Sequence, residues 1–184
     1  MTEKQTSIIM LLVFGLVLLL AAFYTWKVVT NNRNVPESEA PALASLKTVQ
    51  GQAPYTDIDG NEVYLSDYVG TVLVVNSWAS WCPACSAELK KLSEVMQEFE
   101  EAEVVALAIN RAEPSMTAVS YLKTIDSTGS LKLVLDPSDR YYSSIEGYNM
   151  PETVIYDRKG NVVMQKHGAV TKVELKERIE KLLD

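Results

Sequence analysis

The fold of this chain is decided by residues 74–85, which read Val74-Val75-Asn76-Ser77-Trp78-Ala79-Ser80-Trp81-Cys82-Pro83-Ala84-Cys85. The stretch begins in a continuous apolar run, which is typical of a buried central strand. It ends in a segment that opens at proline and repeats apolar residues at helical spacing. The two cysteines of the chain therefore stand where a buried strand gives way to a helix.

Strands and helices are expected to alternate on both sides of this junction. Residues 55–64 predict two short strands around an Asp-Gly turn. Further strands are expected at residues 71–77, 104–109, 131–135, 153–156 and 161–165, and helices at 83–101, 114–126, 139–146 and 171–183. This order predicts an α/β domain, in which an N-terminal hairpin precedes a mixed sheet covered by helices.

Residues 8–26 form an apolar run that contains no charged residue. As a helix it would span roughly 28 Å, which is close to the hydrocarbon thickness of a bilayer. The run is longer than the core of a secretory signal, about 7–15 residues, and bulky Phe23 and Tyr24 follow the small Ala22. We therefore expect a single uncleaved transmembrane helix that contacts the lipid bilayer, with a cleaved leader as the alternative.

The expected anchor divides the chain into four parts. Residues 1–7 would form a short cytoplasmic segment, residues 27–45 a polar linker and residues 46–184 the folded domain. The formal net charge of −7 disfavours a nucleic-acid partner, because phosphates require a basic surface. Charges flanking the span indicate little about orientation, so the short leading segment and the thiol chemistry are what favour an extracytoplasmic catalytic domain at the cell membrane.

The spacing of the cysteines favours a redox pair over other uses. A structural zinc site usually needs four ligands, whereas the chain offers two cysteines and one histidine. Haem attachment requires a histidine directly after the second cysteine, where Ser86 stands. Two unrelated buried thiols remain an alternative.

The position of this pair at the start of a helix favours thiol chemistry. Unpaired backbone N–H groups and the helix dipole can stabilise a thiolate on Cys82. Cys85, one turn along, is then placed to attack a mixed disulfide formed at Cys82. The flanking Trp78 and Trp81 can limit water access or simply pack in the core.

The stretch from Val74 to Cys85 resembles the active-site segment of thioredoxin-fold proteins, in particular the TlpA/ResA-like branch. Members of that branch are commonly membrane-tethered and work outside the cytoplasm. Among them, the thioredoxin-like proteins of cytochrome c maturation also carry Trp-Cys-Pro-x-Cys followed by Ala-Glu. The resemblance covers the chain from about Val49 to its C-terminus and implies a thioredoxin-like fold.

Further matches imply roles for residues outside the cysteine motif. Glu88 matches an acidic residue of this branch and shares a helix face with Cys85, where a partly buried carboxylate can exchange protons with the thiol. Met150 and Pro151 match the segment that carries the family's cis-proline, which together with Trp81 implies a binding groove for an extended substrate. Glu152 is expected either to assist acid–base chemistry or to shape that groove. His167 has no matching role, and we interpret it as structural.

The expected activity is that of a protein-disulfide oxidoreductase, with Cys82, Cys85 and Glu88 as catalytic residues and Cys82–Cys85 as the redox-active disulfide. Dithiol–disulfide exchange with a protein substrate needs no cofactor and no metal. The resemblance implies that a transmembrane thiol transporter of the CcdA/DsbD kind supplies electrons. Glu88 and the Pro-Glu-Thr match favour a specialised reductant. An oxidant that installs disulfides and a tethered peptide-binding module without turnover are the alternatives.

Overall fold

The computed structural model describes residues 15–25, 27, 45–46, 53–125 and 129–184. Contacts divide the chain into two compact units, Met1–Pro41 and Ala42–Asp184. In the first unit, residues 15–25 are helical. None of the helices among the described residues has both the length and the apolar character needed to cross a membrane. Of the predicted span, residues 8–26, residues 8–14 and 26 lie outside the described part, and residues 15–25 are the helical ones.

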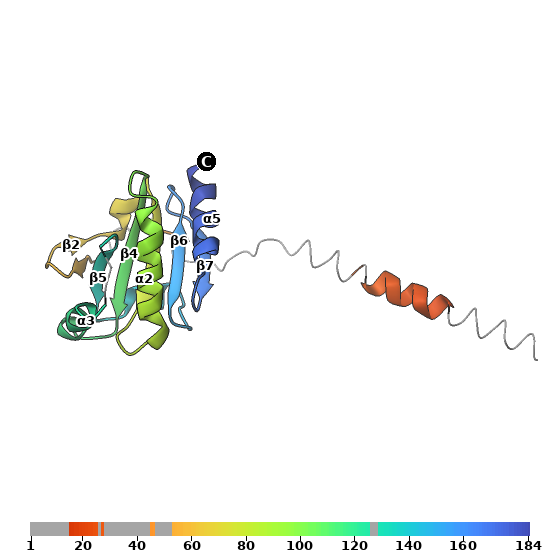
Figure 1. The fold of residues 1–184 in the computed structure, drawn as a ribbon, viewed down its shortest axis with the longest axis horizontal. Helices are drawn as coiled ribbons and strands as arrows, with labels where there is room; N and C mark the ends of the chain where they lie inside the picture. Colours follow the sequence, from red (N-terminus) through yellow and green to blue (C-terminus); the bar gives the residue numbers. More distant parts are fainter. Residues whose placement is uncertain (1–14, 26, 28–44, 47–52, 126–128) are drawn as a thin grey trace, which may run out of the picture. The chain divides into compact units, whose positions relative to one another are not determined.

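The second unit is built on a mixed sheet of seven strands in the order β2-β1-β5-β4-β3-β6-β7 (Figure 1). In chain order, these strands are β1 (Tyr55–Asp57), β2 (Glu62–Val63), β3 (Val72–Trp78), β4 (Val104–Arg111), β5 (Lys132–Asp136), β6 (Glu152–Tyr156) and β7 (Val162–His167). β3 pairs in parallel with β4, and β4 with β5, whereas β6 runs antiparallel to both β3 and β7. The expected α/β sheet with its N-terminal hairpin is confirmed.

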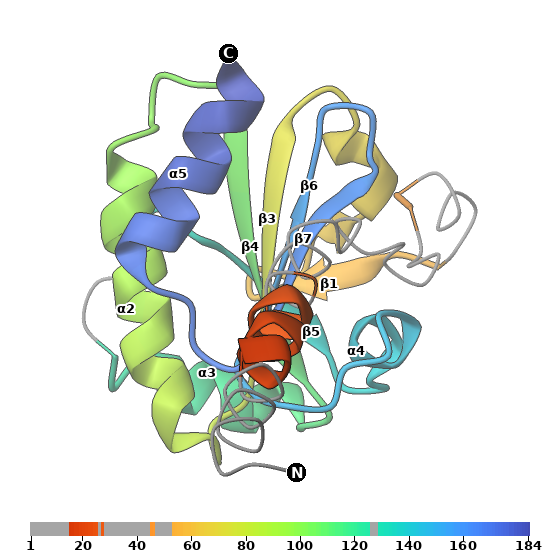
Figure 2. The same cartoon turned by 90° about the vertical axis from the view of Figure 1, so that its right-hand side faces the viewer.

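Helices cover both faces of this sheet (Figure 2). The covering elements are η1 (Leu65–Tyr68), α2 (Pro83–Gln97), α3 (Ser115–Leu122), α4 (Arg140–Ser144) and α5 (Lys172–Leu183). Along β3, Val72 and Val74 pack in the core cluster shared with α2, α3 and α5. Leu73 and Val75 belong to the cluster shared with η1 and α4. Because successive strand residues point to opposite faces, one apolar run fills both cores.

The element boundaries differ from the predicted ones mainly at helix ends. α2 stops at Gln97 rather than Glu101, because the backbone then closes i→i+3 hydrogen bonds from Glu98 to Val95 and from Phe99 to Met96. Phe99 continues the apolar helical spacing but packs into the core after the helix has ended. The short helix η1 was not predicted, because four residues leave no measurable helical period.

Candidate active site

Cys82 and Cys85 lie at the junction of β3 and α2, as the sequence predicted. Cys82 has extended backbone angles and is the N-cap residue of α2, while Pro83 is its first helical residue. The two sulfur atoms form a disulfide of 2.08 Å, with the Cα atoms 5.4 Å apart. The two cysteines are therefore bonded to each other across the first turn of α2.

The two tryptophans beside the cysteines have different environments. Trp78, at the end of β3, is fully buried in the core cluster that contains both cysteines, and its ring lies 6.0 Å from that of Tyr121. Trp81, directly before Cys82, is 58% exposed. Trp78 thus serves packing, whereas Trp81 offers a large apolar surface next to the cysteine that starts the helix.

Glu88 is buried, with an exposed fraction of 1%, and it follows the buried Cys85 by three residues on α2, so the two share a face of the helix. Its Oε1 accepts hydrogen bonds from the Val170 amide at 3.1 Å and from the Thr153 hydroxyl at 3.4 Å. Its Oε2 lies 3.1 Å from Lys91 Nζ. Glu88 is therefore not a solvated helix residue, because it is held by Lys91 of its own helix, by Thr153 of β6 and by Val170 in the loop before α5.

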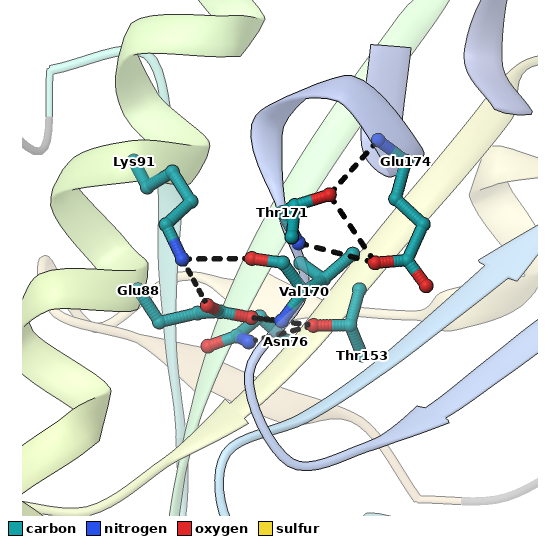
Figure 3. Close-up of polar contacts among 7 residues, drawn as sticks. All are labelled: Asn76, Glu88, Lys91, Thr153, Val170, Thr171 and Glu174. Atoms are coloured by element: carbon teal, nitrogen blue, oxygen red, sulfur yellow. Dashed lines mark hydrogen bonds and ion pairs between the residues drawn. The ribbon is translucent and has the colours of Figure 1, made fainter. Parts of the chain in front are cut away.

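A polar pair from the central strands lies beneath Glu88. Asn76 of β3 donates from Nδ2 to the hydroxyl of Thr153 at 2.9 Å, and both residues are buried (Figure 3). These residues are also register partners in the antiparallel pairing of β3 and β6. A neutral amide and a hydroxyl thus connect the Glu88 carboxylate to the strand that follows Pro151.

The Met150–Pro151 peptide bond is cis, as the resemblance implied. Pro151 is buried immediately before β6, and Met150 packs against the core cluster that includes Cys82 and Cys85. The segment before β6 therefore packs against the same core as the cysteine pair. Binding of a substrate by Met150 and Pro151 stays a prediction.

Glu152 is the first residue of β6 and has no exposed surface. Its Oε2 accepts a hydrogen bond from the Tyr148 amide at 3.2 Å, and its Oε1 accepts one from the Gln165 side chain. His167 Nδ1 lies 2.8 Å from the same Oε1, and the His167 ring contacts that of Tyr148. Burial does not distinguish the two roles expected for Glu152, so acid–base chemistry and shaping of the groove both stay predictions. His167 packs there as part of the structure.

Glu113 was missed by sequence reasoning. This buried carboxylate follows β4 and accepts hydrogen bonds from the Ser80 amide at 2.9 Å, the Ser80 hydroxyl and Asn110 Nδ2 at 2.7 Å. Burial opposes its ionisation, but the hydrogen bonds from Asn110 and Ser80 outweigh it and hold the pKa of Glu113 below its ordinary value. Glu113 thereby fixes the loop that leads into Trp81 and Cys82.

The described residues contain no group of three or more histidine, cysteine or acidic side chains placed to hold a metal ion. What they do bring together is a cysteine pair at a helix start, a buried carboxylate one turn beyond it and a cis-proline segment against the same core. This arrangement suits thiol–disulfide exchange, in which one sulfur forms a mixed disulfide and the other resolves it. The fold and the site define a thioredoxin-like thiol–disulfide oxidoreductase.

Comparison with known proteins places the chain within this class. The model of the AhpC/TSA family matches residues 36–165, and the chain belongs to that family. It is 29% identical over 183 residues to thiol-disulfide oxidoreductase ResA of Geobacillus kaustophilus (strain HTA426) and 28% identical over 183 residues to the ResA of Geobacillus thermodenitrificans (strain NG80-2). Both alignments cover 98% of this chain and 98% of the relative.

Solved structures agree on the fold. A putative thiol:disulfide interchange protein DsbE from Chlorobium tepidum superposes with a TM-score of 0.66 at 23% sequence identity, covering 71% of this chain and 92% of that one. The dsbF protein described as MTB dsbF superposes with a TM-score of 0.65 at 20% identity, covering 73% and 97%. The predicted thioredoxin-like fold is thus confirmed.

Proposed function

We propose that this chain is a membrane-anchored, extracytoplasmic reductant of protein disulfides, such as those of apocytochrome c or another envelope protein. The observation that carries the proposal is the buried carboxylate of Glu88 on the helix face of Cys85, because a reductant must deprotonate its second cysteine to release product. The names of the two ResA relatives, aligned over 98% of their length, support the same class of reaction.

The reaction begins with the reduced pair. The thiolate of Cys82 attacks one sulfur of the substrate disulfide, so that a Cys82–substrate disulfide forms and the other substrate sulfur leaves as a thiolate, which takes up a proton. Glu88 accepts the proton of Cys85, and the Cys85 thiolate attacks the Cys82 sulfur. The second substrate thiolate leaves and is protonated. Two electrons have then passed to the substrate, and Cys82–Cys85 is oxidised as in the structure.

The location and the electron supply are part of the proposal. The uncharged run of residues 8–26 supports a single span, and the thiol–disulfide chemistry favours a catalytic domain outside the cytoplasm. Each turnover leaves Cys82–Cys85 oxidised, so a dithiol donor must reduce it again. A transmembrane thiol transporter of the CcdA/DsbD kind, implied by the resemblance, would carry those electrons across the bilayer.

The test is substrate trapping in native membranes with a Cys85→Ala variant. This variant can form the mixed disulfide at Cys82 but cannot resolve it, so we expect covalent complexes that dissociate on reduction and can be identified by mass spectrometry. The matched control is Cys82→Ala, which should capture far less. Equal capture by both variants would contradict the assignment of the attacking cysteine.

The direction of electron transfer is tested with the purified protein without substitutions, called the parent. A reductant, supplied as the dithiol, converts a disulfide substrate to thiols and ends oxidised. If the oxidised protein converts substrate thiols to disulfides, and the reduced protein does not reduce substrate disulfides, the protein is an oxidant and the proposal is overturned. Peptide binding without transfer in either direction would instead identify a binding module.

A further inference from the structure

Lys91 closes a ring of polar contacts around the buried carboxylate of Glu88 (Figure 3). Its Nζ lies 3.1 Å from Glu88 Oε2 and donates to the Val170 carbonyl oxygen at 2.7 Å. The amide of the same Val170 donates to Glu88 Oε1 at 3.1 Å. Lys91 and the Val170 amide therefore hold the carboxylate directly, and the Val170 carbonyl oxygen holds Lys91 beside it. We call Lys91, Glu88 and Val170 the lysine clamp.

Among the described groups that contact Glu88, Lys91 carries the positive charge. The other groups that bond to Glu88 are the Val170 amide, before α5, and the Thr153 hydroxyl of β6, which Asn76 of β3 supports. On α2 itself, Glu88 shares its face with Cys85 and with Lys91, its i,i+3 partner. Lys91 is 27% exposed, so its ammonium remains partly hydrated while it neutralises a carboxylate that has almost no contact with water.

The Lys91 ammonium can offset the cost of burying the Glu88 carboxylate. A carboxylate removed from water pays a desolvation penalty that neutral hydrogen bonds offset only in part, so an unpaired buried carboxyl tends to hold its proton. A protonated Glu88 cannot accept the proton of Cys85. An adjacent ammonium favours the ionised form and also fixes which oxygen faces which partner.

We propose that Lys91 is a positioning residue that pairs with and orients the Glu88 carboxylate, and thereby sets how fast Cys85 resolves the mixed disulfide. This inference rests on the proposed function and adds a residue that never touches the reacting sulfurs. Lys91 does not change the atoms and electrons that are transferred when Cys85 resolves the mixed disulfide. The Cys85 proton passes to Glu88, the new bond joins Cys85 and Cys82, and the electron pair of the broken bond leaves with the substrate sulfur.

The experiment measures resolution by itself. The reduced protein is mixed with a peptide disulfide, and the mixed disulfide and the final products are followed by acid quenching and mass spectrometry across a pH series. The variants are Lys91→Met, Lys91→Arg and Lys90→Met. Lys90 is the neighbouring exposed lysine on the same helix, so Lys90→Met removes the same charge without touching the clamp.

In Lys91→Met, we expect resolution at neutral pH to slow by about tenfold, a part of the ~100-fold that a positioned proton acceptor typically contributes. Formation of the mixed disulfide at Cys82 should change by less than about twofold. The pH of half-maximal resolution should rise, because Cys85 would lose its oriented proton acceptor and would depend more on hydroxide in solution to form its thiolate. Lys91→Arg should restore most of the rate, and Lys90→Met should match the parent.

The outcomes separate this inference from the proposed function. Equal resolution rates and pH profiles in Lys91→Met and Lys90→Met would overturn the role of Lys91 while leaving the exchange chemistry intact. A slower rate in Lys91→Met with an unchanged pH profile would also overturn it, because a general loss of structure does not act through ionisation. A parent protein that forms no mixed disulfide at Cys82 would instead contradict the proposed function.

Discussion

Two buried carboxylates, Glu88 and Glu113, contact the segments around the cysteine pair, and they are held by different kinds of partner. Glu88 on α2 bonds to a cation, Lys91, as well as to neutral donors. Glu113, after β4, bonds to neutral donors from Ser80 and Asn110. Burial alone therefore does not indicate what an acidic residue does in this fold.

The difference indicates two separate purposes. Glu113 accepts from the backbone and the hydroxyl of Ser80, so it fixes the conformation of the loop before Cys82. Glu88 lies on the face of the helix that carries Cys85 and is suited to exchange a proton with it. We expect substitutions of Glu113 to act on stability and substitutions of Glu88 to act on the rate of exchange.

The largest effect is expected from Glu88→Gln. The amide keeps the size of the side chain but accepts no proton from Cys85, so resolution of the mixed disulfide should fall by about 100-fold. Glu113→Gln, measured in the same single-turnover assay, should stay within about threefold of the parent. Similar losses in both variants would remove the distinction between the two carboxylates.

A stability measurement should reverse that order. Glu113→Ala leaves the Ser80 amide and Asn110 without their buried acceptor, which should lower the free energy of unfolding by about 1–3 kcal/mol. Urea denaturation followed by circular dichroism gives this value. The exposed Glu101→Ala is the control and should change stability by less than about 0.5 kcal/mol. If Glu113→Ala lowers the free energy of unfolding as little as Glu101→Ala does, these hydrogen bonds do not stabilise the fold.

A smaller effect is expected at the loop that holds Glu88 from the side of α5. Thr171 caps this helix, because its hydroxyl accepts from the Glu174 amide at 3.1 Å and the Glu174 carboxylate accepts from the Thr171 amide at 3.3 Å. Thr171→Ala should cost about 1 kcal/mol of unfolding free energy. Thr171→Ser keeps the cap and should restore most of it. No difference between the two variants would show that the cap does not stabilise the domain.

The smallest expected effect is the contribution of Glu113 to the loss of stability at acidic pH. The pKa of folded Glu113 lies below its ordinary value of 4.5, so near that pH the unfolded chain binds more protons at this position than the folded one. The stabilisation is present above pH 4.5 and is lost as the pH falls through the lower, folded value. Urea midpoints between pH 6 and pH 3 should therefore fall more steeply for the parent than for Glu113→Gln. Parallel curves would contradict the lowered pKa.

Local patterns were sufficient to predict much of the fold and the centre of the site. The apolar run of β3, the proline after Cys82 and the spacing along α2 follow from residues close together in sequence. Each strand and each longer helix of the domain was predicted, with errors at the ends such as Phe99. Such errors arise because apolar spacing reports burial, and a buried residue can follow a helix as well as belong to it.

Long-range polar contacts were not predictable in the same way. Ser80 and Glu113 are 33 residues apart, and Glu88 and Val170 are 82 apart. Nothing in the local sequence distinguishes Glu113 from the other acidic residues, apart from its place after a buried strand. Lys90 and Lys91 are the same residue type, and they differ in the side of α2 on which their side chains lie. These partners become evident when the sheet sets the positions of the elements.

The most direct test of the account follows the two cysteines separately in the purified reduced domain. Cys85→Ala and Cys82→Ala are each mixed with a peptide disulfide, and the mass of the intact protein is measured with time. Cys85→Ala should gain one covalently attached peptide at Cys82 and retain it, while Cys82→Ala should gain little. Attachment of the peptide mainly to Cys85 of the Cys82→Ala variant, or to neither protein, would contradict the proposed chemistry.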